Sequence, residues 1–227
     1  MSSFPYSQLD KLIKEYDEDT RIIRKDKLII QNYPKVFLMS TVSYFERQIK
    51  MRVDKFINSP AVSIPVRCHN LHILITAKDK RPITDRVYHK FCAYTNDKGS
   101  LVLDALKFYE LFGGATFESD VNNKFNDVLE ERKKEYDGYI GNLSNCLGIN
   151  DDIDNQYARY IDVRERLDYC TFDKAEKAFL NLKYRRNGVA HDYLERLSDT
   201  FEDLRNFYYD AVLYIIALEE TLKSMTM

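Results

Sequence analysis

The sequence predicts an all-α protein in which antiparallel helices pack around one core. Only seven glycines and five prolines interrupt the 227 residues, and long stretches contain neither. This composition favours long helices over many short strands. In several stretches apolar residues recur three and four positions apart, the period of a helix with one buried face. We therefore expect a single helical domain over residues 1–227, within which the less periodic residues 60–98 form an insertion.

The first part of the chain is expected to contain three helices. Two should span residues 6–16 and 20–31, and a long third helix should run from Asn32 to about Ile57. Pro34 then falls in the first turn of the third helix, where its missing N–H leaves no hydrogen bond unmade. The apolar positions of this helix follow the helical period and comprise Val36, Phe37, Val42, Phe45, Ile49, Val53 and Phe56.

Further helices are expected after the insertion, with a break at Gly113 and Gly114. They should span residues 100–110, 119–146, 151–169 and 173–186, and a last helix should begin near residue 198. The last helix carries an apolar stripe suited to a bundle core or to a subunit interface, formed by Leu204, Phe207, Ala211, Val212, Ile215, Leu218 and Leu222.

The charge balance excludes a global attraction for nucleic acids, because 34 Lys and Arg residues stand against 36 Asp and Glu residues. If the protein binds RNA, a local basic patch must do so. The sequence contains two such patches, namely Lys183 with Arg185 and Arg186, and the stretch with Arg159, Arg164 and Arg166.

The chain is expected to be cytoplasmic, with reduced thiols and no membrane-spanning segment. Its four cysteines lack the close spacing of a disulfide framework, and no basic stretch leading into an apolar run follows Met1. Even the apolar run at residues 211–218 is followed at once by two glutamates. It is much shorter than the roughly 18 apolar residues that a membrane span needs.

Arg186 and His191 form the candidate active site. An arginine holds phosphate oxygens with a planar fork of donors, and a histidine moves protons near neutral pH. Together they are the minimal set for breaking an RNA phosphodiester without a metal ion. The other three histidines lie between residues 69 and 89, so His191 stands apart from them.

The spacing of Arg186 and His191 raises a geometric problem. Residues five positions apart lie roughly 140° apart around an ideal helix, so one straight helix would not present both side chains to the same phosphate. Either a helix end near Gly188 changes the direction of the chain, or a second subunit supplies the missing half of the site. A two-fold axis in this region would bring two arginines and two histidines together.

Residues 186–191, Arg-Asn-Gly-Val-Ala-His, resemble the signature of the HEPN superfamily (higher eukaryotes and prokaryotes nucleotide-binding domain). That signature is an arginine, a polar residue and then a histidine at a spacing of four to six. The helical setting is similar as well, because the HEPN signature lies between the third and fourth core helices of a bundle. The resemblance covers mainly residues 150–225, with weaker support from residues 37–57.

The resemblance implies a metal-independent endoribonuclease that acts as a homodimer on tRNA or mRNA and needs no cofactor. Many such enzymes are toxins of toxin–antitoxin systems or effectors of anti-phage defence. His191 would act as general acid or base, Arg186 would stabilise charge on the phosphorane, and Asn187 would orient the phosphate or the arginine. Attack by the 2′-hydroxyl would leave a 2′,3′-cyclic phosphate and a 5′-hydroxyl, and would select RNA over DNA.

Tyr193 extends the resemblance to HEPN toxins that are paired with minimal nucleotidyltransferase antitoxins. In those toxins the tyrosine two positions after the histidine is adenylylated, which silences the toxin. The antitoxin of this chain would then be a minimal nucleotidyltransferase. A buried or capping tyrosine is the preferred interpretation, because the chain contains 17 tyrosines.

Two less specific interpretations of the motif stay open. Arg186 could bind the carbonyls at a helix C-terminus with His191 packed beside it. The fold could also serve as a non-catalytic scaffold that binds a nucleotide or a protein partner. Supporting roles are open for Arg185 and for Glu46, whose carboxylate could reach into the bundle and hold Arg186, although an exposed Glu46 is the preferred interpretation.

The insertion contains a weak alternative site. Cys68, His72, His89 and Cys92 have a spacing that could hold one tetrahedral zinc ion. Such a site would be structural, because four protein ligands leave no open position for chemistry. Scattered cysteines and surface histidines are the preferred interpretation, so no metal is expected in the active site.

Overall fold

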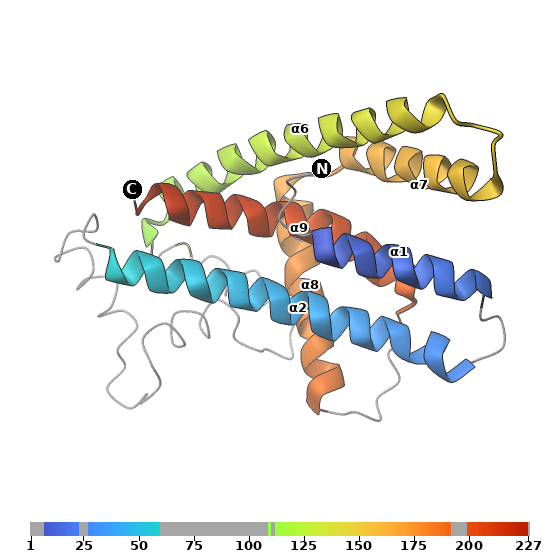
Figure 1. Cartoon of the computed structure of the whole chain (residues 1–227). Helices are drawn as coiled ribbons and strands as arrows, with labels where there is room; N and C mark the ends of the chain where they lie inside the picture. Colours follow the sequence, from blue (N-terminus) through green and yellow to red (C-terminus); the bar gives the residue numbers. More distant parts are fainter. Residues whose placement is uncertain (1–6, 23–26, 60–108, 110–111, 192–198, 227) are drawn as a thin grey trace.

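A computed structural model of the protein describes residues 7–22, 27–59, 109, 112–191 and 199–226. Within these residues the chain forms six helices and no strands, which confirms the predicted all-α class (Figure 1). The helices are α1 (Ser7–Ile22), α2 (Lys27–Asn58), α6 (Ala115–Ser144), α7 (Asp151–Asp168), α8 (Phe172–His191) and α9 (Phe201–Ser224). The predicted insertion and, apart from Tyr109, the predicted helix at residues 100–110 lie outside the described residues.

Helix α9 is the centre of the bundle. Every residue from Tyr208 to Glu219 is buried, and the helix contacts α2, α6 and α8. The apolar stripe predicted for this helix therefore belongs to the bundle core. A reciprocal cap starts the helix: the Thr200 hydroxyl accepts from the N–H of Asp203 at 3.1 Å, and the Asp203 carboxylate accepts from the N–H of Thr200 at 2.9 Å.

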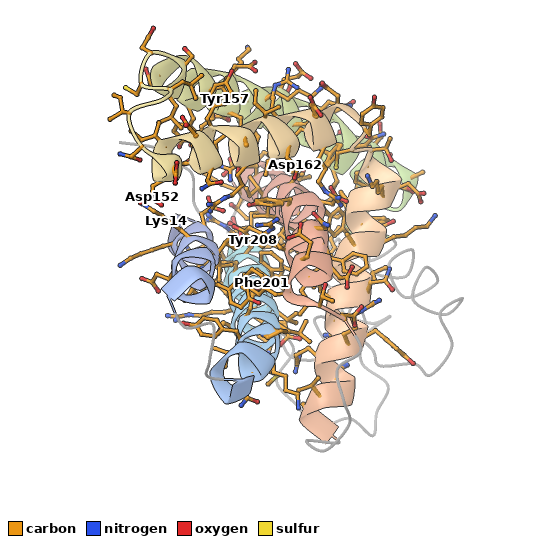
Figure 2. All side chains as sticks on the ribbon, turned by 90° about the vertical axis from the view of Figure 1, so that its right-hand side faces the viewer. Lys14, Asp152, Tyr157, Asp162, Phe201 and Tyr208 are labelled. Carbon is orange, nitrogen blue, oxygen red and sulfur yellow. The ribbon has the colours of Figure 1, made fainter. Side chains whose placement is uncertain are left out.

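The other helices are arranged around α9. Helix α2 lies on one side of it, and α6 with α7 forms an antiparallel hairpin on the other side (Figures 1 and 2). Helix α8 crosses both α2 and α9 and packs against them, and α1 packs beside α2. The sequence signature at residues 186–191 forms the C-terminal end of α8, so it is positioned by the crossing with α2.

The start of α2 differs from the prediction. Helix α1 continues to Ile22 and α2 begins at Lys27, so no separate helix spans residues 20–31. Pro34 consequently lies inside α2 and not in its first turn. An internal proline removes one backbone hydrogen bond, and burial of Phe37 and Leu38 just beyond it offsets that loss.

The core face of α2 follows the predicted apolar period with one exception. Val36 was expected to face the core, but 56% of its surface is exposed. The neighbouring Leu38 is fully buried instead. The remaining predicted positions are all buried, and they comprise Phe37, Val42, Phe45, Ile49, Val53 and Phe56.

Helix α8 also departs from the prediction. A helix end near Arg186 was expected because Gly188 weakens helices, but α8 continues through Gly188 to His191. A glycine inside a helix costs only about 0.5–1 kcal/mol relative to alanine, and the adjacent Val189 is buried. The local preference for a helix end is therefore overridden by packing.

The α6–α7 hairpin agrees more closely with the prediction. Gly113 and Gly114 have φ values of 127° and 62°, so the chain turns in a left-handed conformation immediately before α6. The Asn150 side chain accepts a hydrogen bond from the N–H of Ile153 at 2.9 Å and caps α7. Among the described residues no helix is long and apolar enough to cross a membrane.

Candidate active site

A three-residue charge cluster links α2 to the signature segment of α8. Oε1 of Glu46 on α2 accepts hydrogen bonds from Nζ of Lys183, at 3.0 Å, and from Nη2 of Arg186. The exposed fractions of these side chains are 17% for Glu46, 8% for Lys183 and 19% for Arg186. The preferred interpretation of an exposed Glu46 is thus wrong, and its carboxylate contacts Arg186 inside the bundle.

Local packing explains why these three side chains meet. Lys183 and Arg186 are three positions apart, so they lie on the same face of α8. One turn before Lys183, the ring of Phe179 meets the ring of Phe45 edge to face, with centroids 6.1 Å apart. Because Glu46 follows Phe45 directly, this aromatic contact sets the register in which the carboxylate reaches both cations.

The cluster carries a surplus positive charge, and its three side chains are largely buried. Two cations share one carboxylate, and burial lowers the pKa of Arg186 below its ordinary value, although a guanidinium stays protonated in proteins. Its Nε is buried and has no hydrogen-bond partner among the described residues. The bond to Glu46 uses Nη2 and is charge-assisted, so it holds the guanidinium of Arg186 in place.

The other signature residues are placed less completely. Asn187 is half-buried, one position after Arg186. His191 is the last residue of α8, and its backbone alone is described. Because α8 is continuous, the Cα atoms of Arg186 and His191 lie roughly 140° apart around the helix axis. The helix does not end between Arg186 and His191, so a change of chain direction does not bring them together. The other alternative, a site shared between two subunits, stays a prediction.

Arg185 is not part of the charge cluster. Its Nε donates to Oδ2 of Asp199 at 2.7 Å, and its guanidinium carbon lies 4.7 Å from the ring centroid of Phe207. These contacts tie α8 to the start of α9. Arg185 therefore supports the packing of the two helices and does not contact Glu46.

The second basic patch predicted from the sequence is largely neutralised. Arg166 donates from Nη2 to Asp210 at 2.6 Å, and Arg164 donates from Nε to Asp137 at 2.8 Å. Both arginines therefore hold neighbouring helices together. The candidate zinc ligands and Tyr193 lie outside the described residues, and within the described part of the chain no group of side chains could hold a metal ion.

Two buried polar clusters were not anticipated from the sequence. The Tyr109 hydroxyl donates to Oε1 of Glu176, and the Tyr214 hydroxyl donates to the same oxygen at 3.3 Å. Burial raises the pKa of Glu176 above its ordinary value. No short-range pattern could have revealed this cluster, because it joins residues that are 38 to 105 positions apart.

The second cluster surrounds Arg132 on α6. This side chain is only 4% exposed, and its Nη2 donates to Asp10 on α1 at 3.0 Å. The Tyr208 hydroxyl on α9 donates to the same carboxylate at 2.8 Å. The cluster therefore joins α1, α6 and α9, far from the signature segment, and its role is structural.

Comparison with known proteins decides the family. A family model described as RiboL-PSP-HEPN matches residues 6–224. The chain belongs to this HEPN family. The match extends well beyond the segment on which the sequence resemblance rests, and it includes both helices that form the charge cluster. Neither the search of curated proteins nor that of solved structures returns a match.

Membership in the HEPN superfamily gives the charge cluster a functional context. It indicates a nuclease or a nucleotide-binding role, and both roles require a site that accepts phosphate. In this HEPN domain the arginine of the signature is the residue that α2 holds in place. Glu46 and Lys183 are therefore the additional residues to consider in any account of the site.

Proposed function

We propose that this HEPN protein is a metal-independent endoribonuclease. The 2′-hydroxyl of RNA attacks the adjacent phosphorus, the bond from phosphorus to the 5′-oxygen breaks, and the products carry a 2′,3′-cyclic phosphate and a 5′-hydroxyl. The observation that supports this proposal most directly is the positioned guanidinium of Arg186, held by Glu46 beside Lys183. A preorganised donor of this kind stabilises charge that develops in the transition state.

The residues of the signature have separate roles in this proposal. His191 moves the proton from the 2′-hydroxyl, or delivers one to the departing 5′-oxygen, a task worth about 100-fold to 10,000-fold in rate. Arg186 binds the phosphorane oxygens, and Asn187 orients the phosphate. Glu46 and Lys183 are positioning residues, because they act on the substrate through Arg186.

The active unit is a homodimer with a composite site. Because Arg186 and His191 lie on different sides of one continuous helix, each phosphate is contacted by Arg186 of one subunit and by the partner's His191. A two-fold axis generates two such sites. The enzyme is the toxin or effector of a toxin–antitoxin or anti-phage system and acts on tRNA or mRNA.

The test is a cleavage assay with purified protein. Wild type, His191→Ala and Arg186→Ala are incubated with total RNA and with tRNA in EDTA, and the fragments and their end groups are analysed. Lys177→Ala, which alters an exposed residue of the same helix, is the matched control. Wild type and the control should produce cyclic-phosphate ends, and the other two variants should not.

A second function is favoured by the same contact. The contact between Arg186 and Glu46 could serve only to hold α2 and α8 together. If so, the fold is a non-catalytic scaffold that binds a nucleotide or a protein partner. In that case Arg186→Ala lowers the free energy of unfolding, and RNA stays intact with every variant. Intact RNA in the presence of a folded wild-type dimer would contradict the nuclease proposal.

A further inference from the structure

The signature segment of α8 is held by α9 as well as by α2. Arg185 donates from Nε to Oδ2 of Asp199 at 2.7 Å, and its guanidinium carbon lies 4.7 Å from the ring centroid of Phe207. Asp199 lies two residues before α9, and Phe207 lies in the second turn of that helix. Arg185 and Asp199 are 21% and 16% exposed, so their ion pair is more shielded from water and salt than a surface pair.

The contacts to α2 and to α9 lie on different sides of α8. Because α8 is continuous through this segment, Arg185 is roughly 100° from Arg186 and roughly 160° from Lys183 around the helix axis. Among the residues of α8 after Lys183 whose burial is described, only Val189 is buried. Core packing therefore restrains this end of α8 less than the rest of the helix. Polar contacts on two sides of the helix oppose a rotation that one contact alone would permit.

The start of α9 is itself fixed in the bundle. The ring centroid of Phe201 lies 3.6 Å from that of Tyr16 on α1 and 5.1 Å from that of Phe37 on α2, and Figure 2 shows Phe201 beside α2. Thr200 and Asp203 form the reciprocal cap of the same helix end. Side chains that are locked by packing and hydrogen bonds give a fixed position to the group that they support. The contacts of Arg185 are thus made to a rigid part of the fold.

The rotation of α8 matters because Arg186 and His191 both lie on the segment that is held. A helix with its side chains has a radius of about 5–6 Å, so a rotation of about 10° moves an atom at its surface by about 1 Å. A displacement of this size at a reacting group can lower the rate about 100-fold. In a composite site, one rotation would displace the arginine of one site and the histidine of the other.

We infer that Arg185 and Asp199 are positioning residues that fix the rotation of α8, so that Arg186 and His191 are correctly placed for RNA cleavage. This inference rests on the proposed function, because it assumes that the substrate is RNA. The guanidinium of Arg185 is occupied by Asp199 and Phe207, so it acts through the helix and not through a contact with the substrate. The pair therefore affects the rate of cleavage and not the affinity for RNA.

Asp199→Asn tests the inference, because it removes the charge that Arg185 binds and keeps the size of the side chain. The matched control is Glu202→Gln, which removes the same charge from the first turn of α9, where Glu202 pairs with Arg205 of the same helix. Both full-length variants and wild type are studied below their unfolding temperatures. Three quantities are measured: the cleavage rate at a saturating concentration of an RNA that wild type cuts, the affinity for an uncleavable 2′-O-methyl oligonucleotide, and the hydrogen exchange of the backbone amides at residues 183–191.

The expected result is a loss of rate without a loss of affinity. Asp199→Asn should lower the cleavage rate about 10-fold to 100-fold, because the reacting groups are displaced. It should change the affinity for the oligonucleotide by less than about twofold, because no group that binds RNA is removed. Exchange at residues 183–191 should be faster, because the end of α8 opens more often. Glu202→Gln should match wild type in all three measurements.

A double variant shows whether the two residues act through one contact. If they do, Arg185→Gln/Asp199→Asn should cleave no more slowly than Arg185→Gln alone, because the first substitution already removes the contact. Losses of rate that multiply in the double variant would show that the two residues act separately, and would overturn the inference.

Other outcomes would overturn the inference as well. They are an equal loss of rate in the control, a loss of affinity in place of rate, and slower cleavage with unchanged hydrogen exchange. If wild type cuts RNA and Asp199→Asn cuts it equally fast, the nuclease proposal stands and only the positioning role is wrong. If wild type cuts no RNA, the nuclease proposal fails, and the role of this ion pair in cleavage fails with it.

Discussion

Glu46 is the residue on which the geometry of the signature depends. Its single carboxylate is the shared partner of Lys183 and Arg186, and all three side chains are largely buried. Removing one member of a buried charge group leaves the others without a partner, which costs more than the group contributes when intact. The candidate site is therefore also a place where a single substitution should affect stability.

Replacing Glu46 by Gln should lower the free energy of unfolding by roughly 1–3 kcal/mol, because two largely buried cations lose their counter-charge. Urea unfolding measures the change. Glu130→Gln is the control, because Glu130 forms an exposed pair with Lys133, and a surface pair of this kind is worth at most about 1 kcal/mol. If both substitutions lowered the free energy of unfolding by the same amount, the Glu46 cluster would contribute no more to stability than an exposed pair.

Glu176 should make stability fall as pH rises. Burial raises the pKa of its carboxyl in the folded protein above the ordinary value of 4.5. Between the unfolded and the folded pKa, the folded protein binds more protons than the unfolded chain, so the free energy of unfolding decreases as pH rises through this window. It stays lower at higher pH, where the carboxylate is ionised in both states.

Glu176→Gln isolates this effect, since an amide cannot ionise and still offers an oxygen to Tyr109. The free energy of unfolding of the variant relative to wild type should rise as pH increases from about 4 to 8. Urea unfolding of both proteins at several pH values gives this difference directly. A difference that is constant across the range would contradict a raised pKa for Glu176.

At the scale of helices, two glycines allow the effect of helix propensity on stability to be measured apart from the effect of backbone conformation. Gly138 lies inside α6, and a Cβ atom added there would meet nothing within 4 Å. Gly114 also has open space around it, but its φ is +62°. The two positions therefore differ in backbone conformation and not in crowding.

Gly138→Ala should raise the free energy of unfolding by about 0.8–1 kcal/mol, because alanine is the better helix former. Gly114→Ala should lower it by about 1–2 kcal/mol, because a Cβ atom is unfavourable in the left-handed region. Thermal or urea unfolding of the two variants measures both values. Destabilisation by Gly138→Ala would indicate that α6 is constrained in a way that its open surface does not reveal.

Elements with strong local signals were the ones that could be predicted. Helix α7 begins at Asp151 as expected, where Asn150 provides a cap, and the turn before α6 occurs at Gly113 and Gly114. The continuation of α8 through Gly188 and the position of Pro34 inside α2 were missed. Both depend on packing between distant segments, which overrides local preference.

The sequence alone supplies the candidate residues of the site, which stay a prediction, but it does not supply their contacts. The spacing of Arg186 and His191 can be found along the chain, and the family match includes both residues. The partner of Arg186 could not be chosen in the same way, because Glu46 lies 140 positions away. Only the crossing of α2 and α8 brings these two side chains together.

At the scale of the whole molecule, a continuous α8 makes a shared site testable by mixing subunits. In a two-fold dimer that pairs Arg186 of one subunit with His191 of the other, a mixed dimer of Arg186→Ala and His191→Ala contains one site with both natural residues. When the two variants are co-expressed and pair at random, about half of the dimers are mixed, and each mixed dimer has one of its two sites intact. Cleavage should therefore recover to about a quarter of the wild-type level. No recovery from a purified mixed dimer would place both residues of each site in one subunit.

The central position of α9 has a consequence for synthesis on the ribosome. This helix comes after α1, α2, α6, α7 and α8 in the chain, yet α2, α6 and α8 all pack against it. A nascent chain that has not yet released α9 from the exit tunnel exposes the apolar faces of those helices to water and to chaperones. The bundle that holds Arg186 in place can therefore assemble only after translation has passed α9, so shorter nascent chains contain the signature without its supporting fold.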